Sequence, residues 1–173
     1  MSDLISLANL DVSELEWRQP ALGRKFELSS SAGPHARLDF QKITGSLALA
    51  TTARATWSFK RQGMLKSHVD IRFADSDQPL ATYEPNFSGR KGSLKYAGGQ
   101  YLDFQSTNFF NTEWQWITPE GDGLIGFRQK GMGKPHAIVY LGDEAFQRID
   151  LDLLLILGFY VLVLLQQDAT IAT

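Results

Sequence analysis

The sequence predicts a mainly β domain with one buried helix near the C-terminus. Two observations lead to this prediction. Apolar and polar residues alternate along many short stretches between Lys25 and Tyr140, with turn-forming residues between them, and an uncharged apolar run covers Leu153 to Leu165. Alternation over about four to eight residues is typical of strands with one buried face, and repeated short strands indicate a sandwich or a barrel.

Length and composition are those of a globular protein. The 173 residues fit one domain, and the apolar fraction of 43% and charged fraction of 21% are ordinary. The absence of cysteine excludes disulfides, thiolate metal sites and cysteine nucleophiles. A net charge of −2 argues against a general nucleic-acid-binding protein. We therefore expect a single domain over residues 1–173 that binds no nucleic acid.

The first seventeen residues contain regularly placed apolar side chains, including Leu7, Leu15 and Trp17. This pattern fits either an edge strand or a short amphipathic turn, and both interpretations stay open. The chain does not begin with a basic segment followed by an apolar one, so we expect no secretory signal and a cytoplasmic location.

The central strands are predicted from period-two alternation, which places the apolar residues of each stretch on one face. The inward residues are expected to be Phe26 and Leu28; Leu38 and Phe40; Ala55, Trp57 and Phe59; Val69, Ile71 and Phe73; Leu94 and Tyr96; Trp114 and Trp116. Turns are expected at Gly33-Pro34, Asp75–Asp77, Ser88–Gly92, Gly98-Gly99 and Glu120–Gly123, where turn-forming residues cluster.

The apolar run predicts a central helix over about residues 151–167. Thirteen uncharged residues in a helix span about 20 Å, against roughly 30 Å of bilayer hydrocarbon, and no Lys or Arg flanks the run. A helix that is apolar on all sides must be buried on all sides. A C-terminal membrane anchor and a buried strand pair are the alternatives. Gly158 lowers the stability of such a helix by about 1 kcal/mol relative to Ala; the alternative interpretation of this glycine is that another part of the backbone approaches closely there.

The sequence resembles the tubby-like superfamily, which includes tubby domains, phospholipid scramblases and LURP-one-related proteins, and is most similar to the small LURP-one-related type. The strand-and-turn series Trp57–Trp116, the turn at Glu120–Gly123 and the run Leu153–Leu165 followed by Gln166–Asp168 carry the resemblance, which covers Lys25 to Ala169. It implies a closed antiparallel barrel of about twelve strands around the C-terminal helix. It implies binding of anionic lipid head groups through basic surface residues, as in tubby domains. The small LURP-one-related proteins themselves have no settled biochemical activity.

Basic residues around two predicted turns are the candidate binding site. Residues 51–100 contain eight Lys and Arg against four Asp and Glu. If the two turns meet, their side chains can bind a phosphate-rich head group, because anionic surfaces attract each nearby basic residue by about 1 kcal/mol. Ordinary solvated hairpin tips are the alternative. The candidate lipid-binding residues are Lys60, Arg61, Lys66, Arg90, Lys91 and Lys95.

No motif predicts catalysis, a metal or a cofactor. The chain has three histidines, and none has a second histidine at metal-ligand spacing. Trp114 and Trp116 point the same way and are expected in the core rather than in a ligand site. We therefore expect a non-enzymatic binding or regulatory module, peripheral to an anionic membrane or bound to a protein partner. A small-molecule carrier barrel and a tail-anchored protein with a cytosolic β domain are the alternatives. The oligomeric state cannot be read from the sequence.

Overall fold

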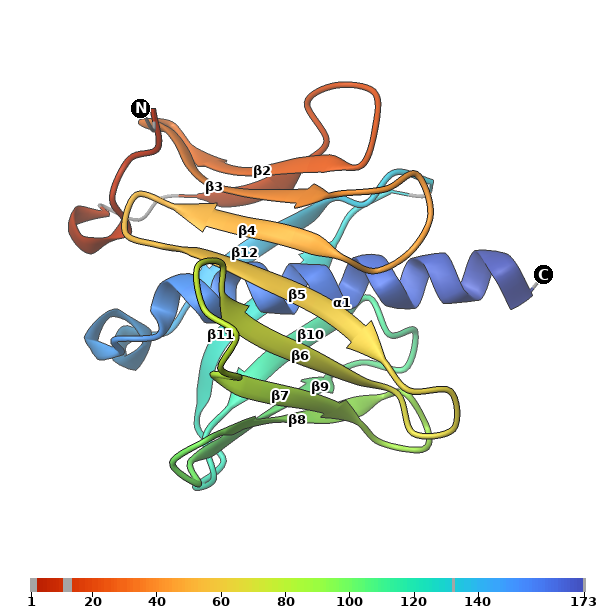
Figure 1. Ribbon diagram of the computed structural model, residues 1–173. Coiled ribbons are helices and arrows are strands. Elements are labelled where there is room, and N and C mark those ends of the chain that lie inside the picture. The colour runs from red at the N-terminus through yellow and green to blue at the C-terminus, as the bar shows by residue number, and fades with distance from the viewer. Residues whose placement is uncertain (1–2, 11–13, 132, 173) are drawn as a thin grey trace.

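The computed structural model describes residues 3–10, 14–131 and 133–172. Its strands form a closed antiparallel barrel of twelve, and one helix, α1 (Leu151–Ala172), runs through the middle of the barrel (Figure 1). The expected mainly β barrel around a C-terminal helix is therefore confirmed.

The chain visits the strands in order around the barrel. Their bounds are β1 (Leu15–Arg18), β2 (Lys25–Ser30), β3 (Gly33–Phe40), β4 (Ala48–Thr52), β5 (Thr56–Gln62), β6 (His68–Phe73), β7 (Ala81–Pro85), β8 (Lys91–Tyr96), β9 (Tyr101–Ser106), β10 (Glu113–Ile117), β11 (Gly123–Gln129) and β12 (Ala137–Leu141). Short 3₁₀ helices, η1 (Leu7–Asn9) and η2 (Asp143–Gln147), precede β1 and follow β12.

Each strand pairs with its neighbours in sequence, and β1 closes the barrel against β12. Leu15 lies opposite Val139 and Trp17 opposite Ala137 in this closing pair. Because successive strands are antiparallel, the loops between them lie alternately at the two ends of the barrel. Helix α1 enters at the end where β12 finishes, so its last turns emerge at the end that holds the β1–β2 loop and every second loop after it (Figure 1).

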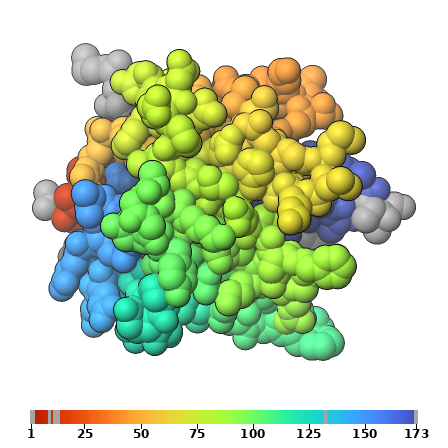
Figure 2. Space-filling model, turned by 60° about the horizontal axis from the view of Figure 1, so that its bottom comes forward, coloured from red at the N-terminus to blue at the C-terminus, as the bar shows by residue number. Residues whose placement is uncertain are grey.

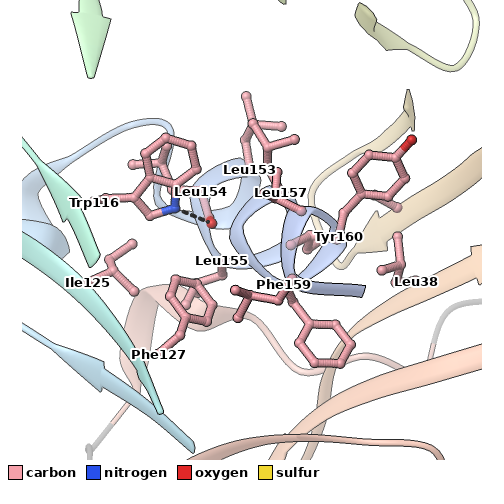
Figure 3. Packing of buried hydrophobic residues seen from close by; sticks show 14 of the residues in the cluster. Leu38, Trp116, Ile125, Phe127, Leu153, Leu154, Leu155, Leu157, Phe159 and Tyr160 are labelled. Carbon is pink, nitrogen blue, oxygen red and sulfur yellow. Dashed lines mark hydrogen bonds between the residues drawn. The ribbon is translucent and has the colours of Figure 1, made fainter. Parts of the chain in front are cut away.

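The helix forms the centre of the hydrophobic core. Every residue from Leu151 to Leu164 is buried, as a helix that is apolar on all sides requires. Trp17 stacks on Phe159 with ring centroids 4.7 Å apart. The indole of Trp17 donates a hydrogen bond of 3.2 Å to the carbonyl of Leu155. The indole of Trp116 donates one of 2.9 Å to the carbonyl of Leu154, drawn as a dashed line in Figure 3. Trp114 and Trp116 are both core residues, as expected.

Within the described residues, α1 is the one helix long and apolar enough to cross a membrane. Its apolar part covers Leu151–Ile171, and 61% of the most apolar 18-residue segment within it is buried inside the protein. In this structure those buried residues contact the wall of the barrel.

Gly158 packs so closely against side chains of the barrel wall that a larger residue has no room there. A Cβ added there would lie 2.5 Å from Cζ of Phe127 and 3.0 Å from Nε1 of Trp116. Another part of the chain does approach Gly158 closely, as predicted. The approaching groups are the side chains of Phe127 and Trp116 rather than a backbone segment (Figure 3).

The structure also extends two of the predicted elements. Helix α1 continues to Ala172, beyond the expected end at residue 167, because its last turns leave the barrel and carry no apolar signal. The N-terminal segment contains both a short helical turn, η1, and a strand, β1, so the two interpretations of residues 1–17 apply to different parts of it.

Candidate functional site

Six loops surround the last turns of α1 at one end of the barrel. They span residues 19–24, 41–47, 63–67, 86–90, 107–112 and 130–136, and we call them together the basic end. In Figure 1 they lie on the same side as the C-terminus, and in Figure 2 the β5–β6 loop, in yellow, projects beside the end of the helix. Residues of all six loops line cavities that α1 also lines.

Charge is segregated between the two ends. The six loops of the basic end contain no Asp or Glu, and their basic residues are Arg24, Lys42, Lys66, Arg90, Lys130 and Lys134. The strand-connecting loops at the opposite end, which we call the acidic end, together with the 142–150 segment contain Asp75, Asp77, Glu120, Asp122, Asp143, Glu144 and Asp150 against Arg54 and Arg148. The protein therefore has a strong charge asymmetry along the helix axis despite its small net charge.

Two arginines near the basic end hold the fold together. Arg24 donates hydrogen bonds to the carbonyl of Gly45 (2.9 Å) and to Oε1 of Gln167 (2.7 Å), and burial lowers the pKa of its guanidinium. Arg61 donates two hydrogen bonds to Asp168, at 2.7 and 3.0 Å, and these bonds raise the pKa of its guanidinium. Both contacts anchor the emerging last turns of α1.

The other cations of the basic end are available to a ligand. Lys42, Lys66, Lys130 and Lys134 are exposed, and among the described residues none of them has an ion-pair partner. Arg90 is exposed and donates one hydrogen bond of 3.1 Å to the carbonyl of Asn108, a contact that leaves its positive charge unneutralised.

Three of these cations converge on one cavity. Arg90, Lys130 and Lys134 line a hollow of about 430 Å³ against the last turns of α1, and no carboxylate is among its lining residues. His136 also lines it, with its Nε2 against the carboxylate of Glu16 on β1. Partial burial by itself raises the pKa of the Glu16 carboxyl, but the hydrogen bonds from His136 and Arg18 together outweigh it, so the pKa is lowered.

The structure brings the two predicted basic turns together. The β5–β6 and β7–β8 loops share a groove that Leu65, Lys66 and Phe87 line, and Asn86 and Ser67 contribute to it. Of the predicted residues, Lys66 and Arg90 lie in these loops. Lys60 is exposed on β5 beside the β5–β6 loop.

The remaining predicted cations already have partners. Arg61 is bound to Asp168, as described above. Nζ of Lys91 lies 3.3 Å from Asp103, and Nζ of Lys95 lies 2.8 Å from Glu84, both on the outer wall of the barrel. Sequence reasoning missed Lys42, Lys130 and Lys134, since their loops are far apart in the chain.

The basic end also exposes large apolar side chains. Phe87 is 108% exposed relative to a free residue, Met64 102% and Leu65 100%, and Leu22 and Ile43 are 93% each. Phe109 and Phe110 pack edge to face against each other and are 81% and 78% exposed. At the acidic end only Ile149, at 87%, is comparably exposed among the described residues.

An apolar groove of about 580 Å³ opens at the acidic end, where Trp57, Leu80 and Leu153 line it. The described residues contain no group of three or more His, Asp or Glu side chains that could hold a metal ion. His35 is buried and hydrogen-bonds to Ser30 and the carbonyl of Ile5, so its role is structural.

Comparison of the chain with family models, with curated proteins and with solved structures gave no significant match.

Proposed function

We propose that this protein is a non-enzymatic binding module that attaches to anionic phospholipid surfaces through the basic end of its barrel. One observation carries the proposal: six loops that are distant in sequence meet at one end with six basic residues and no acidic residue. A cytoplasmic location, peripheral to a membrane, is part of the proposal.

Elementary electrostatics favours this orientation. Attraction to an anionic membrane contributes about 1 kcal/mol per basic residue near the surface. Charges farther than about 10 Å from that surface are largely screened at 0.1 M salt. With the basic end toward the lipid, the acidic residues lie at the far end of the barrel, so the net charge of −2 does not oppose binding.

The distribution of the free cations suits an extended surface better than a small solute. Lys42 lies in the β3–β4 loop, Lys66 in the β5–β6 loop and Lys134 in the β11–β12 loop, around the circumference of the end. A membrane contacts all of these loops at once, and among the described residues these three lysines have no ion pair that must break first. The resemblance to tubby-like proteins, whose tubby domains bind phosphoinositide head groups, is an independent reason to expect anionic lipid.

Flotation of the purified protein with vesicles tests the proposal. Vesicles of phosphatidylserine and phosphatidylcholine are compared with vesicles of phosphatidylcholine alone, at low and high salt. We expect binding to the anionic vesicles only, weakened by salt. We expect the variant Arg90→Glu/Lys130→Glu/Lys134→Glu to lower the partition coefficient by on the order of 100-fold or more, at about 1 kcal/mol per residue lost. Equal binding to neutral vesicles, or undiminished binding of the variant, would contradict the proposal.

A small-molecule carrier is the second candidate, because the groove at the acidic end is apolar and of ligand size. Helix α1 fills the lumen where a carrier barrel ordinarily keeps its cavity. A saturable rise in melting temperature with an apolar fluorophore, lost on Leu153→Ala but kept in the basic-end variant, would favour this function.

A further inference from the structure

We infer that the basic end does more than adsorb electrostatically: its apolar loop tips insert into the acyl boundary of the bilayer, so that the barrel stands end-on with the last turns of α1 facing the membrane. This inference rests on the proposed binding of anionic phospholipid and adds the geometry of that binding.

The first observation is the position of the exposed apolar residues. Leu22, Ile43, Met64, Leu65, Phe87, Phe109 and Phe110 lie in five of the six loops of the basic end. Met132, in the sixth loop, lies outside the described residues. Scattered exposed apolar residues are ordinary on a protein surface. Here nearly all the fully exposed apolar residues of the described chain gather at one end, and a concentrated set marks an interaction surface.

The second observation is that apolar and basic residues lie close together in the sequence of several of these loops; the 107–112 loop has no basic residue of its own, and Arg90 of the 86–90 loop donates a hydrogen bond to the carbonyl of Asn108 in it. Lys42 precedes Ile43, Lys66 follows Leu65, and Arg90 lies three residues after Phe87. An apolar tip flanked by cations fits the boundary between acyl chains and anionic head groups, where each kind of group meets its preferred surroundings. A purely apolar protein interface lacks partners for these cations.

The third observation is that the acidic end lacks this combination. Ile149 is as exposed as the loop tips, but the nearest charged side chains in sequence, Arg148 and Asp150, are bonded to each other at 2.8 Å. The two ends therefore provide a test site and an internal control in one molecule.

Because the chain contains no cysteine, a single label can be placed at either end. Phe109→Cys and Ile149→Cys are each labelled with an environment-sensitive fluorophore and mixed with phosphatidylserine–phosphatidylcholine vesicles that carry nitroxide quenchers on the acyl chains. We expect a blue shift and quenching for the label at position 109, and no change for the label at position 149.

Flotation gives the second measurement. The variant Phe87→Ser/Phe109→Ser/Phe110→Ser should lower the partition coefficient on anionic vesicles by on the order of 100-fold, since membrane affinity scales with buried apolar area. The matched change Ile149→Ser should leave it unaltered. Circular dichroism checks the fold, and only variants with the wild-type spectrum are compared.

The outcomes separate the inference from the proposed function. If the basic residues are required but the phenylalanines are not, and the label at 109 is not quenched, the protein adsorbs without insertion and the inference is overturned. If no vesicle is bound at all, both fail. If the serine substitutions instead abolish a concentration-dependent dimer, a second copy covers the tips, and the inference is again overturned.

Discussion

The two ends of the barrel hold the same helix in different ways. At the acidic end the polar groups bond to one another: Thr52 donates a buried 2.7 Å hydrogen bond to Asp152, and Tyr96 and Arg148 both bond to Asp150. At the basic end Arg61 holds Asp168 at the surface. The exposed lysines of that end do not help to hold the helix. At the acidic end these bonded residues fix the start of the helix, whereas at the basic end Lys42, Lys66, Lys130 and Lys134 have no ion-pair partner among the described residues.

This difference predicts that substitutions lower the free energy of unfolding most in the enclosed helix, less at the acidic end and least at the basic end. Gly158→Val should cause the largest loss of stability. The added side chain collides with the buried ring of Phe127, and we expect a loss of about 3 kcal/mol in the free energy of unfolding. Urea denaturation measures it. Ala169→Val, on an exposed turn of the same helix, should cost under about 1 kcal/mol. Equal losses would mean that Phe127 moves aside freely.

The next effect is at the acidic end. Thr52→Val removes the hydroxyl that bonds to the buried carboxylate of Asp152, and leaving such a group without its partner costs about 2 kcal/mol. Thr51→Val, the same change on the neighbouring outward-facing position, is the control and should be near neutral. If the two variants unfold at the same urea concentration, Asp152 does not depend on Thr52.

Alkaline pH compares hydroxyl anchors at the two ends. Burial, together with the hydrogen bond to Asp150, raises the pKa of Tyr96 above its ordinary value of 10.0. Burial also raises the pKa of Tyr160, which donates a 2.6 Å hydrogen bond to the carbonyl of Ser46. Below about pH 10 both the folded and the unfolded chain keep these protons, and their full contribution to stability is present. Above it the unfolded chain ionises first, so stability falls as pH rises.

Urea midpoints between about pH 9 and pH 11 measure this effect. The variant Tyr96→Phe/Tyr160→Phe should show a shallower decline than the wild type, since it has lost two of the groups responsible. A decline of the same steepness would mean that these tyrosines do not control alkaline stability.

The smallest stability effect is expected at the basic end. Asp168→Asn weakens a partly exposed ion pair and should change the free energy of unfolding by less than about 1 kcal/mol. It also removes a negative charge beside the basic loops and frees Arg61. Binding to anionic vesicles should therefore rise severalfold in flotation assays. A fall in binding would show that the Arg61–Asp168 contact shapes the lipid site.

The fold was largely predictable because burial leaves a local pattern. Alternation detected strands such as β5 and β10, and the apolar run detected α1 up to the point where it leaves the barrel. Alternation did not reveal strand β4, because its inward residues include Ala48 and Ala50, and small residues give a weak alternation signal. Alternation did not reveal strand β12, because its first three residues, Ala137, Ile138 and Val139, are all buried and do not alternate with exposed ones.

The basic end was only partly predictable. The sequence pointed to Lys66 and Arg90, which lie in neighbouring hairpins on the same end. Grouping them with Lys42, Lys130 and Lys134 requires knowing which loops share an end, and that depends on counting every strand correctly. Alternation located only β2, β3, β5, β6, β8 and β10, so the alternation of basic and acidic loops around the barrel is hidden in the sequence. The wall residues Lys91 and Lys95 entered the prediction because a strand residue near a turn resembles a turn residue in sequence.

The most direct test of the account compares two variants of equal net charge. One is Arg90→Glu/Lys130→Glu/Lys134→Glu at the basic end, and the other is Arg54→Glu/Arg72→Glu/Lys95→Glu on the acidic half of the barrel. Their partition coefficients on phosphatidylserine–phosphatidylcholine vesicles are measured by flotation at the same salt concentration. We predict that the first variant loses binding and the second keeps nearly all of it. Equal losses would show that overall charge, and not the basic end, determines binding.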